Sequence, residues 1–298
     1  MIVPEFNGNV PIRLVDDTPS AYEFLQWVVD DRCPLMAVDV ETDGLDWFDG
    51  RLRLAQFGTV SSGGWAIPVE RFPNVVKEAL AVFTDRRTHL VGHNVKFDLH
   101  WLERHLGFKV KDWALIHDTM LLAGVIDSAG SKALKDLAEH YVHSGAKSGQ
   151  SDLKRDMKRG GWDWGTVPTN LTTYWIYGVI DTILTAHLFY RLLDKATASG
   201  CLDAYSTERG ALPVLYAMER KGMLVDGEYC REHITKLLAR CEEIEKEVEQ
   251  YGVSNVRSTA QIAKALLDAG VVLTEKTDSG NWRMDADTLD AVVSSSNN

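Results

Sequence analysis

Three carboxylic acids stand at the end of an apolar stretch early in the chain. The segment "LMAVDVETDG" begins uncharged and then places Asp39, Glu41 and Asp43 within its last six residues. Side chains two positions apart on a strand point the same way, so we expect these acids to share a face, with Val40 opposite. Because clustered carboxylates repel one another, the pattern indicates either a strand emerging into solvent or a site for a divalent cation.

Two further acids occur in sequence contexts that are typical of catalytic or metal-binding residues. Asp98, in "HNVKFD", directly follows an expected strand end, although the helix dipole alone would also favour an acid in a first helical turn. Asp181, in "YGVID", lies in the middle of an almost apolar helix, with Tyr177 one turn earlier on the same face. Since an unpaired buried acid is costly, Asp181 is either a metal ligand or hydrogen-bonded to a tyrosine or arginine.

Together these segments resemble a known enzyme superfamily. "DVETDGLD", "HNVKFD" and "YGVID" match, in order and spacing, the exonuclease motifs of the tyrosine branch of the DEDD superfamily. "HDTMLLAGVIDS" and "KALKDLAEHYV" are similar to the proofreading domain of bacterial and phage family A (DNA polymerase I-like) DNA polymerases. "ERGALPVLYAMERKGMLVD" and "VRSTAQIAKALLDAG" resemble the start of the polymerase domain of that family, at the thumb.

The resemblance implies a fold and a division of the chain. We expect an α/β, ribonuclease H-like exonuclease domain, with a mixed sheet flanked by helices, in residues 1–200. A partial, mainly helical thumb would occupy residues 201–298, and no segment resembles the palm or fingers motifs. The chain would then be an engineered fragment or part of a naturally split polymerase, without a 5′-nuclease domain and without polymerase activity of its own.

The resemblance also implies a metal site. Two divalent cations, Mg²⁺ or Mn²⁺, would be held by four acids, Asp39, Glu41, Asp98 and Asp181. Asp39 would be shared between the ions, one of which would activate water while the other stabilises the departing 3′ oxygen. Tyr177 is expected to be protonated and to orient the water.

Other positions would contact DNA. Thr42, Leu45 and Asn94 match the region that grips the 3′ end, with Leu45 wedged against the terminal bases or, alternatively, part of the core. The thumb-like segment contributes a second set of expected contacts: Asn255, Arg257, Ser258 and Thr259. The family pattern does not require Asp43 or Asp46, which we interpret as acids of a solvated turn.

The composition of the chain limits the class of protein and its cellular location. The 298 residues are 45% hydrophobic, carry a net charge of -11 and include four scattered cysteines without a CxxC pair. This balance argues against a general polyanion binder and favours reduced thiols. We expect no leader, no apolar run of membrane-spanning length and no membrane partner, and therefore an intracellular location. The resemblance to bacterial and phage polymerases implies the cytoplasm of a bacterium or a phage-infected host.

The secondary structure expected around the motifs is mixed. "RLRLAQF" alternates like a half-exposed strand, and "TVSSGGW" predicts the turn of a hairpin. A long apolar helix is expected over residues 171–195, and a charged helix with a narrow apolar stripe over residues 228–252.

The sequence therefore predicts a metal-dependent 3′-5′ exodeoxyribonuclease that proofreads during DNA replication. Its partners would be the single-stranded or frayed 3′ end of DNA and the missing palm and fingers part of the polymerase. An RNA-processing DEDD exonuclease and a catalytically silent DNA- or partner-binding module are the alternatives.

Overall fold

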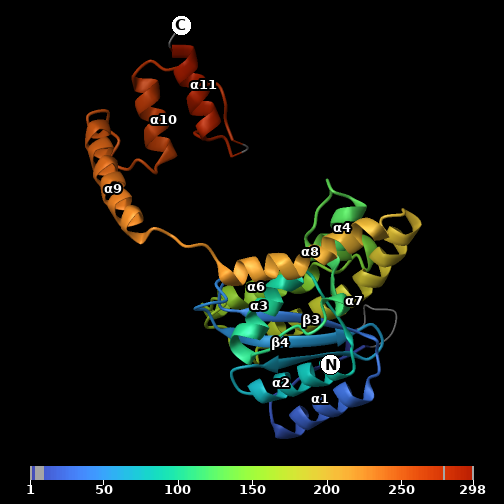
Figure 1. Ribbon diagram of the computed structural model, residues 1–298. Helices are drawn as coiled ribbons and strands as arrows, with labels where there is room; N and C mark the ends of the chain where they lie inside the picture. The colour runs from blue at the N-terminus through green and yellow to red at the C-terminus, as the bar shows by residue number, and fades with distance from the viewer. Residues whose placement is uncertain (1, 4–9, 278, 297–298) are drawn as a thin grey trace. The chain divides into compact units, whose positions relative to one another are not determined.

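The protein, in the form of a computed structural model, is described over residues 2–3, 10–277 and 279–296 (Figure 1). Its contacts divide the chain into two compact units, Met1–Gly222 and Met223–Asn298.

The first unit is built on a mixed sheet. In the described part of the chain the sheet has seven strands in the order β1-β2-β5-β4-β3-β6-β7. β3, β4 and β5 are antiparallel neighbours, β2 runs parallel to β5, and β6 and β7 continue parallel to β3. The strands are β1 (Ile2–Val3), β2 (Val10–Leu14), β3 (Leu35–Thr42), β4 (Leu52–Thr59), β5 (Gly63–Pro68), β6 (His89–Gly92) and β7 (Ile116–Asp118).

Helices cover both faces of this sheet. α1 and α2 lie on one side and α7 on the other (Figure 1). The helices of the unit are α1 (Thr18–Asp30), α2 (Pro73–Asp85), α3 (Val95–Leu106), the 3₁₀ helix η1 (Trp113–Leu115), α4 (Thr119–Ile126), α5 (Leu134–Tyr141), α6 (Ser148–Gly160), α7 (Thr172–Ala198) and α8 (Leu202–Lys221).

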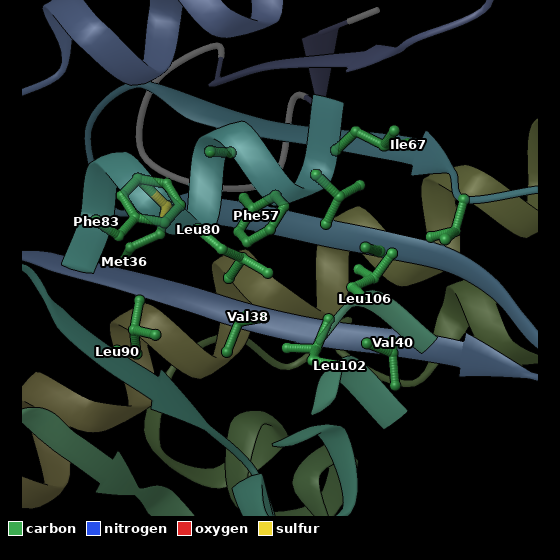
Figure 2. Close-up of a cluster of buried hydrophobic side chains, with 14 of the residues drawn as sticks. Met36, Val38, Val40, Phe57, Ile67, Leu80, Phe83, Leu90, Leu102 and Leu106 are labelled. Carbon is green, nitrogen blue, oxygen red and sulfur yellow. The ribbon is translucent and has the colours of Figure 1, made fainter. Parts of the chain in front are cut away.

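The alternation of β3 decides which way its acids point. Met36, Val38 and Val40 join the cluster that includes Leu80 and Phe83 of α2 (Figure 2). The intervening residue Ala37 instead packs with apolar residues of α7. Because alternate strand residues point to opposite faces, the odd-numbered acids of β3 lie on the α7 side of the sheet.

The prediction that "RLRLAQF" is half exposed is wrong, since every residue of β4 is buried. Arg53 of this strand is in contact with segments that lie later in the sequence. Arg53 donates to the carbonyls of Trp164 and Val167, each at 2.8 Å, and pairs with Glu70 at 3.0 Å. The charged side chain is buried because each of these partners supplies an oxygen.

The expectation that no apolar run reaches membrane-spanning length is also wrong. α7 has 27 residues and includes an 18-residue window that is apolar enough, by length and composition alone, to cross a bilayer. However, 61% of that window is buried inside the protein, as in the core helix of a globular domain.

The first unit includes α8, which lies beyond the predicted boundary at residue 200. Tyr205, Leu212 and Tyr216 of α8 are buried, and the Tyr216 hydroxyl donates to the Leu99 carbonyl of α3 at 3.1 Å. The functional division of the chain at residue 200 stays a prediction.

The second unit is helical and thinly packed. It contains α9 (Gly227–Glu249), α10 (Thr259–Asp268) and α11 (Ala286–Ser296). Val253, Ala263 and Leu273 are its buried apolar side chains among the residues whose burial is described. An apolar pocket of about 520 Å³ lies between α9 and α10 and is lined in part by Val248 and Leu266.

Candidate active site

Two of the predicted site acids are placed by β3. Asp39 is half-buried and Glu41 is buried, and both lie on the face of β3 that α7 covers. A register shift against β4 between Glu41 and Thr42 ends the regular alternation there. Asp43 therefore leaves the strand and pairs with Arg51 at 3.0 Å. Asp43 thus does not share the strand face expected from simple alternation, and it lies in the turn.

Asp98 is fixed to the same strand by a backbone hydrogen bond. The pairing of β3 with β6 ends at Ala37, and further along β3 the amide of Val40 donates to Asp98 Oδ1 at 3.0 Å. The carboxylate thus satisfies a strand amide between Asp39 and Glu41. Asp98 is almost completely buried, in the first turn of α3, where the helix dipole favours a negative charge.

The start of α3 is held by an acid that the sequence reasoning overlooked. Asp118, buried at the end of β7, accepts hydrogen bonds from the amides of Asn94 and Val95 at 3.0 and 2.9 Å. The same carboxylate caps α4 by accepting from the amide of Met120 at 2.8 Å. Asp118 therefore ties two helix starts together and positions Asp98. An Asp directly before a helical segment was the signal that could have identified it.

Asp181 and Tyr177 come from α7. Asp181 is buried and Tyr177 is half-buried, one helical turn earlier. Asp181 Oδ1 accepts a hydrogen bond from the ammonium of Lys135, a buried residue of α5. The Lys135 Nζ also lies 4.6 Å from the centre of the Tyr177 ring. Sequence reasoning assigned no role to Lys135.

The charges of these groups act on one another. Burial and, after it, the charge of Asp181 raise the pKa of Asp39 to about 8, although Lys135 opposes the shift. Burial followed by the charges of Asp39 and Asp181 raises the pKa of Glu41. Burial and then Asp39 raise the pKa of Asp98. The pKa of Asp181 is raised by burial against the opposing effect of Lys135. Four acids from three elements thus share one electrostatic environment.

The same acids influence Tyr177. Burial and then the charges of Asp181, Glu41 and Asp39 raise the pKa of its phenol well above the ordinary value. Tyr177 is therefore a hydrogen-bond donor at neutral pH.

This donor set fits a hard divalent cation, because buried carboxylate oxygens that repel one another are stabilised by such an ion. The groups are close but not arranged as ligands. Among the described residues, no three His, Cys, Asp or Glu side chains converge closely enough to hold a metal ion as they stand. The cation that contacts Asp181 is Lys135.

The residues of the first unit that are predicted to contact substrate differ in their exposure to solvent. Leu45 is 86% exposed, which excludes the alternative that it belongs to the core. Asn94 is exposed and adopts a left-handed conformation with φ 63°. Thr42 is buried, and its hydroxyl donates to the carbonyl of Gly44 at 2.6 Å.

The predicted contacts of the second unit form a local turn. Asn255 Oδ1 accepts from the Arg257 amide at 2.9 Å, and Ser258 caps the start of α10. Thr259 is the first residue of α10, and the side chains of Asn255, Arg257 and Thr259 are exposed. Their contact with DNA stays a prediction.

Comparison with known families decides the class of the protein. A family model described as 3′-5′ exonuclease, from the family A DNA polymerases, matches residues 23–196 of the 298. The chain belongs to this 3′-5′ exonuclease family. The resemblance predicted from the motifs is thereby confirmed.

Relatives of this exonuclease family member include phage polymerases. The DNA polymerase of Mycobacterium phage L5 is 28% identical over 98% of this chain, which spans 51% of that relative. The DNA polymerase of Escherichia phage T5 is 31% identical over 48% of this chain and 17% of its own length. The chain thus spans about half, or less, of the curated relatives it matches.

Solved structures confirm the predicted ribonuclease H-like α/β fold. The POL domain of Pol1 from M. smegmatis, complexed with primer-template DNA and dNTP, matches with a TM-score of 0.57 at 17% identity, over 96% of this chain and 46% of that one. Brucella melitensis NrnC with bound Mg²⁺ matches with a TM-score of 0.52 at 18% identity, over 72% of this chain and 94% of that one. At these identities the likeness concerns the fold.

Proposed function

We propose that the chain is a metal-dependent 3′-5′ exodeoxyribonuclease that removes nucleotides from DNA 3′ ends and proofreads for a family A DNA polymerase. One observation supports the proposal most directly: in a domain of the 3′-5′ exonuclease family, four acids lie close enough to affect one another's pKa values and that of a tyrosine. These residues are Asp39, Glu41, Asp98, Asp181 and Tyr177. The phage polymerase relatives favour DNA as the substrate, the rest of a polymerase as the partner and the cytoplasm of a bacterium or infected host as the location.

The carboxylates would hold two divalent ions, Mg²⁺ or Mn²⁺. The Mg²⁺ bound to the structural neighbour NrnC supports this choice of ion. Asp39, Glu41 and Asp181 would hold one ion, while Asp39 and Asp98 would hold the other. When bound, such ions supply an activated water and compensate the charge on the attacking and leaving oxygens.

Tyr177 would orient the attacking water. Its raised pKa keeps the phenol protonated, so the hydroxyl can donate or accept a hydrogen bond but cannot serve as a base at neutral pH. A protonated phenol beside three acids holds a water in a fixed direction without adding charge.

The DNA end would be held by residues around the site. Leu45 presents an apolar side chain to solvent directly after the strand that carries Asp39 and Glu41. Such a side chain can insert against unpaired bases, whose stacking contributes about 1–3 kcal/mol per base. Thr42 is the last residue of β3 and Asn94 directly precedes α3, and both would contact the terminal nucleotide. A substrate held this way must be unpaired, at a cost of a few kcal/mol.

The proposal is tested with a 5′-labelled DNA hairpin whose 3′ end is matched or mismatched. In Mg²⁺ we expect shortening from the 3′ end, faster at the mismatch, and no shortening in EDTA. Added nucleotides should give no extension. An RNA strand of the same sequence should be degraded more slowly. Equal rates on matched and mismatched ends would contradict proofreading, and faster cleavage of RNA would favour an RNA-processing role.

A further inference from the structure

One cation lies among the acids of the candidate active site. Lys135 comes from α5, which packs against α7, and its ammonium forms a hydrogen-bonded ion pair with Asp181. The side chains are 11% and 7% exposed respectively, so solvent screens the pair weakly.

Lys135 acts on more than one acid. Its charge lowers the pKa of Asp39 and Glu41 as well as that of Asp181, against the larger opposing effect of burial. Its Nζ lies 4.6 Å from the centre of the Tyr177 ring, a distance typical of a cation–π contact. The ammonium therefore acts on Asp39, Glu41, Asp181 and Tyr177, which are four of the five side chains that we assign to metal binding and water orientation.

The ammonium and a divalent ion have overlapping requirements. Both need an oxygen of Asp181, and two cations held by one carboxylate in a buried site repel each other strongly. A single positive charge also offsets only part of the charge of the acids around it, whereas a divalent ion offsets more. Lysine has a flexible four-carbon stem, so its ammonium can leave a site without backbone movement.

We propose that Lys135 is a built-in counter-cation for Asp181 that a divalent ion must displace. Lys135 holds the acids together before metal arrives and weakens metal binding. This inference rests on the proposed metal-dependent nuclease. A purely structural ion pair would instead support stability equally with and without metal and leave metal affinity unchanged.

The experiment compares the full chain with Lys135→Met, which keeps an unbranched side chain and removes the charge. Mn²⁺ binding is measured by titration calorimetry, and thermal melts are recorded in EDTA and in saturating Mn²⁺. We expect the variant to bind Mn²⁺ at least about tenfold more tightly, because a repelling charge is removed. In EDTA it should melt about 5–10 °C lower, and Mn²⁺ should close most of this gap.

Two further variants complete the design. Lys135→Gln keeps a hydrogen-bond donor for Asp181 without the charge and should also bind Mn²⁺ more tightly. Lys147→Met removes a lysine that pairs with Asp136 and Glu139 of the same helix α5, at 2.8 and 2.7 Å, but outside the site. Its Mn²⁺ affinity should equal that of the parent.

The outcomes separate this inference from the proposed function. A parent chain that binds no Mn²⁺ overturns both. A parent that binds Mn²⁺, together with Lys135 variants that bind it equally or more weakly, overturns only the counter-cation role. If Lys135→Met folds only when Mn²⁺ is present, the metal has replaced the ammonium and the inference is supported.

Discussion

Two long helices illustrate how differently the two units use their side chains. α7 spans 27 residues and buries residues along its whole length, including Asp181, whereas none of the 23 residues of α9 is buried. The apolar stripe predicted for α9 is present, but Ile234, Leu237, Leu238 and Ile244 are between 40% and 63% exposed.

The two units differ in how firmly they can fix the position of a functional side chain. An acid surrounded by packed strands and helices has a fixed position and a shifted pKa, as chemistry at a phosphodiester requires. Exposed polar residues such as Arg257 can adjust to the flexible backbone of a DNA strand, but they cannot hold reacting groups in a fixed geometry. The comparison predicts that changes in the first unit affect catalysis and acid stability, while loss of the second unit has a smaller effect.

The largest effect is expected from Asp39→Ala. This acid is the proposed ligand of both ions, so hydrolysis of a 5′-labelled single strand should fall at least about 1,000-fold. The exposed acid Asp49 provides the control, and Asp49→Ala should retain the parent rate. Unchanged hydrolysis by Asp39→Ala would remove this residue from the site.

The direction in which Asp39→Ala changes stability can also be predicted. The folded-state pKa of Asp39, about 8, lies above its ordinary value, so the unfolded chain loses this proton first and stability falls as pH rises from about 4 to 8. Without metal at pH 8, Asp39→Ala should therefore melt at or above the parent temperature. Asp181→Ala should melt lower, because it leaves the buried Lys135 without its hydrogen-bonded partner.

A smaller effect is expected from Tyr177→Phe. Only the hydroxyl that orients water is removed, so the single-turnover rate at saturating Mn²⁺ should fall about 10–100-fold while Mn²⁺ affinity stays the same. A rate equal to that of the parent would assign Tyr177 to packing.

The burial of His117 in the first unit should make the folding stability of the protein sensitive to acid. Burial, followed by the charges of Arg209 and His89, lowers the pKa of His117 to about 3. Neutral His117 contacts His89 at 2.8 Å and Tyr205 of α8 at 3.3 Å. Since the unfolded chain binds this proton first, stability is full above about pH 6.5 and is lost as pH falls toward 3.

Urea unfolding at pH 5 and pH 7.5 tests this point. The parent should lose stability between these values by up to about 1.4 kcal/mol per pH unit from this histidine, and His117→Gln should lose less. The exposed His140 is the control, and His140→Gln should behave like the parent. Equal acid sensitivity of all three proteins would contradict the assignment.

The smallest effect is expected from removing the second unit. A chain ending at Gly222 retains α8 and every acid of the site, so it should hydrolyse single-stranded DNA within about threefold of the full rate. Loss of the unfolding transition in this truncated chain would show that the first unit depends on the second for its folding.

The acids of the proposed site were predicted from the resemblance of three short motifs to an exonuclease superfamily, and each motif is local in sequence. The alternation of β3 and the helical spacing of Tyr177 and Asp181 are local properties. Lys135 could not be found this way, because it is a charged residue of a short amphipathic helix and becomes buried only where α5 meets α7.

Contacts between residues that are distant in sequence explain the remaining errors in the predicted fold. The burial of Arg53 depends on Trp164 and Val167, more than a hundred residues later in the chain. β2 was overlooked because its five residues include Pro11, and because its partner β5 is remote in sequence. The acceptor for the Val40 amide could not be predicted either, since it depends on where β6 stops pairing with β3.

The hydrogen bond from the Val40 amide to Asp98 links a backbone proton to a proposed metal ligand. The chemical shift of an amide responds to the charge and distance of the oxygen that accepts from it. In a nitrogen–proton correlation spectrum, the Val40 signal therefore reads the state of Asp98 directly. Its position would follow metal titration without any substrate, and its rate of exchange with deuterium would record how often this corner of the sheet opens.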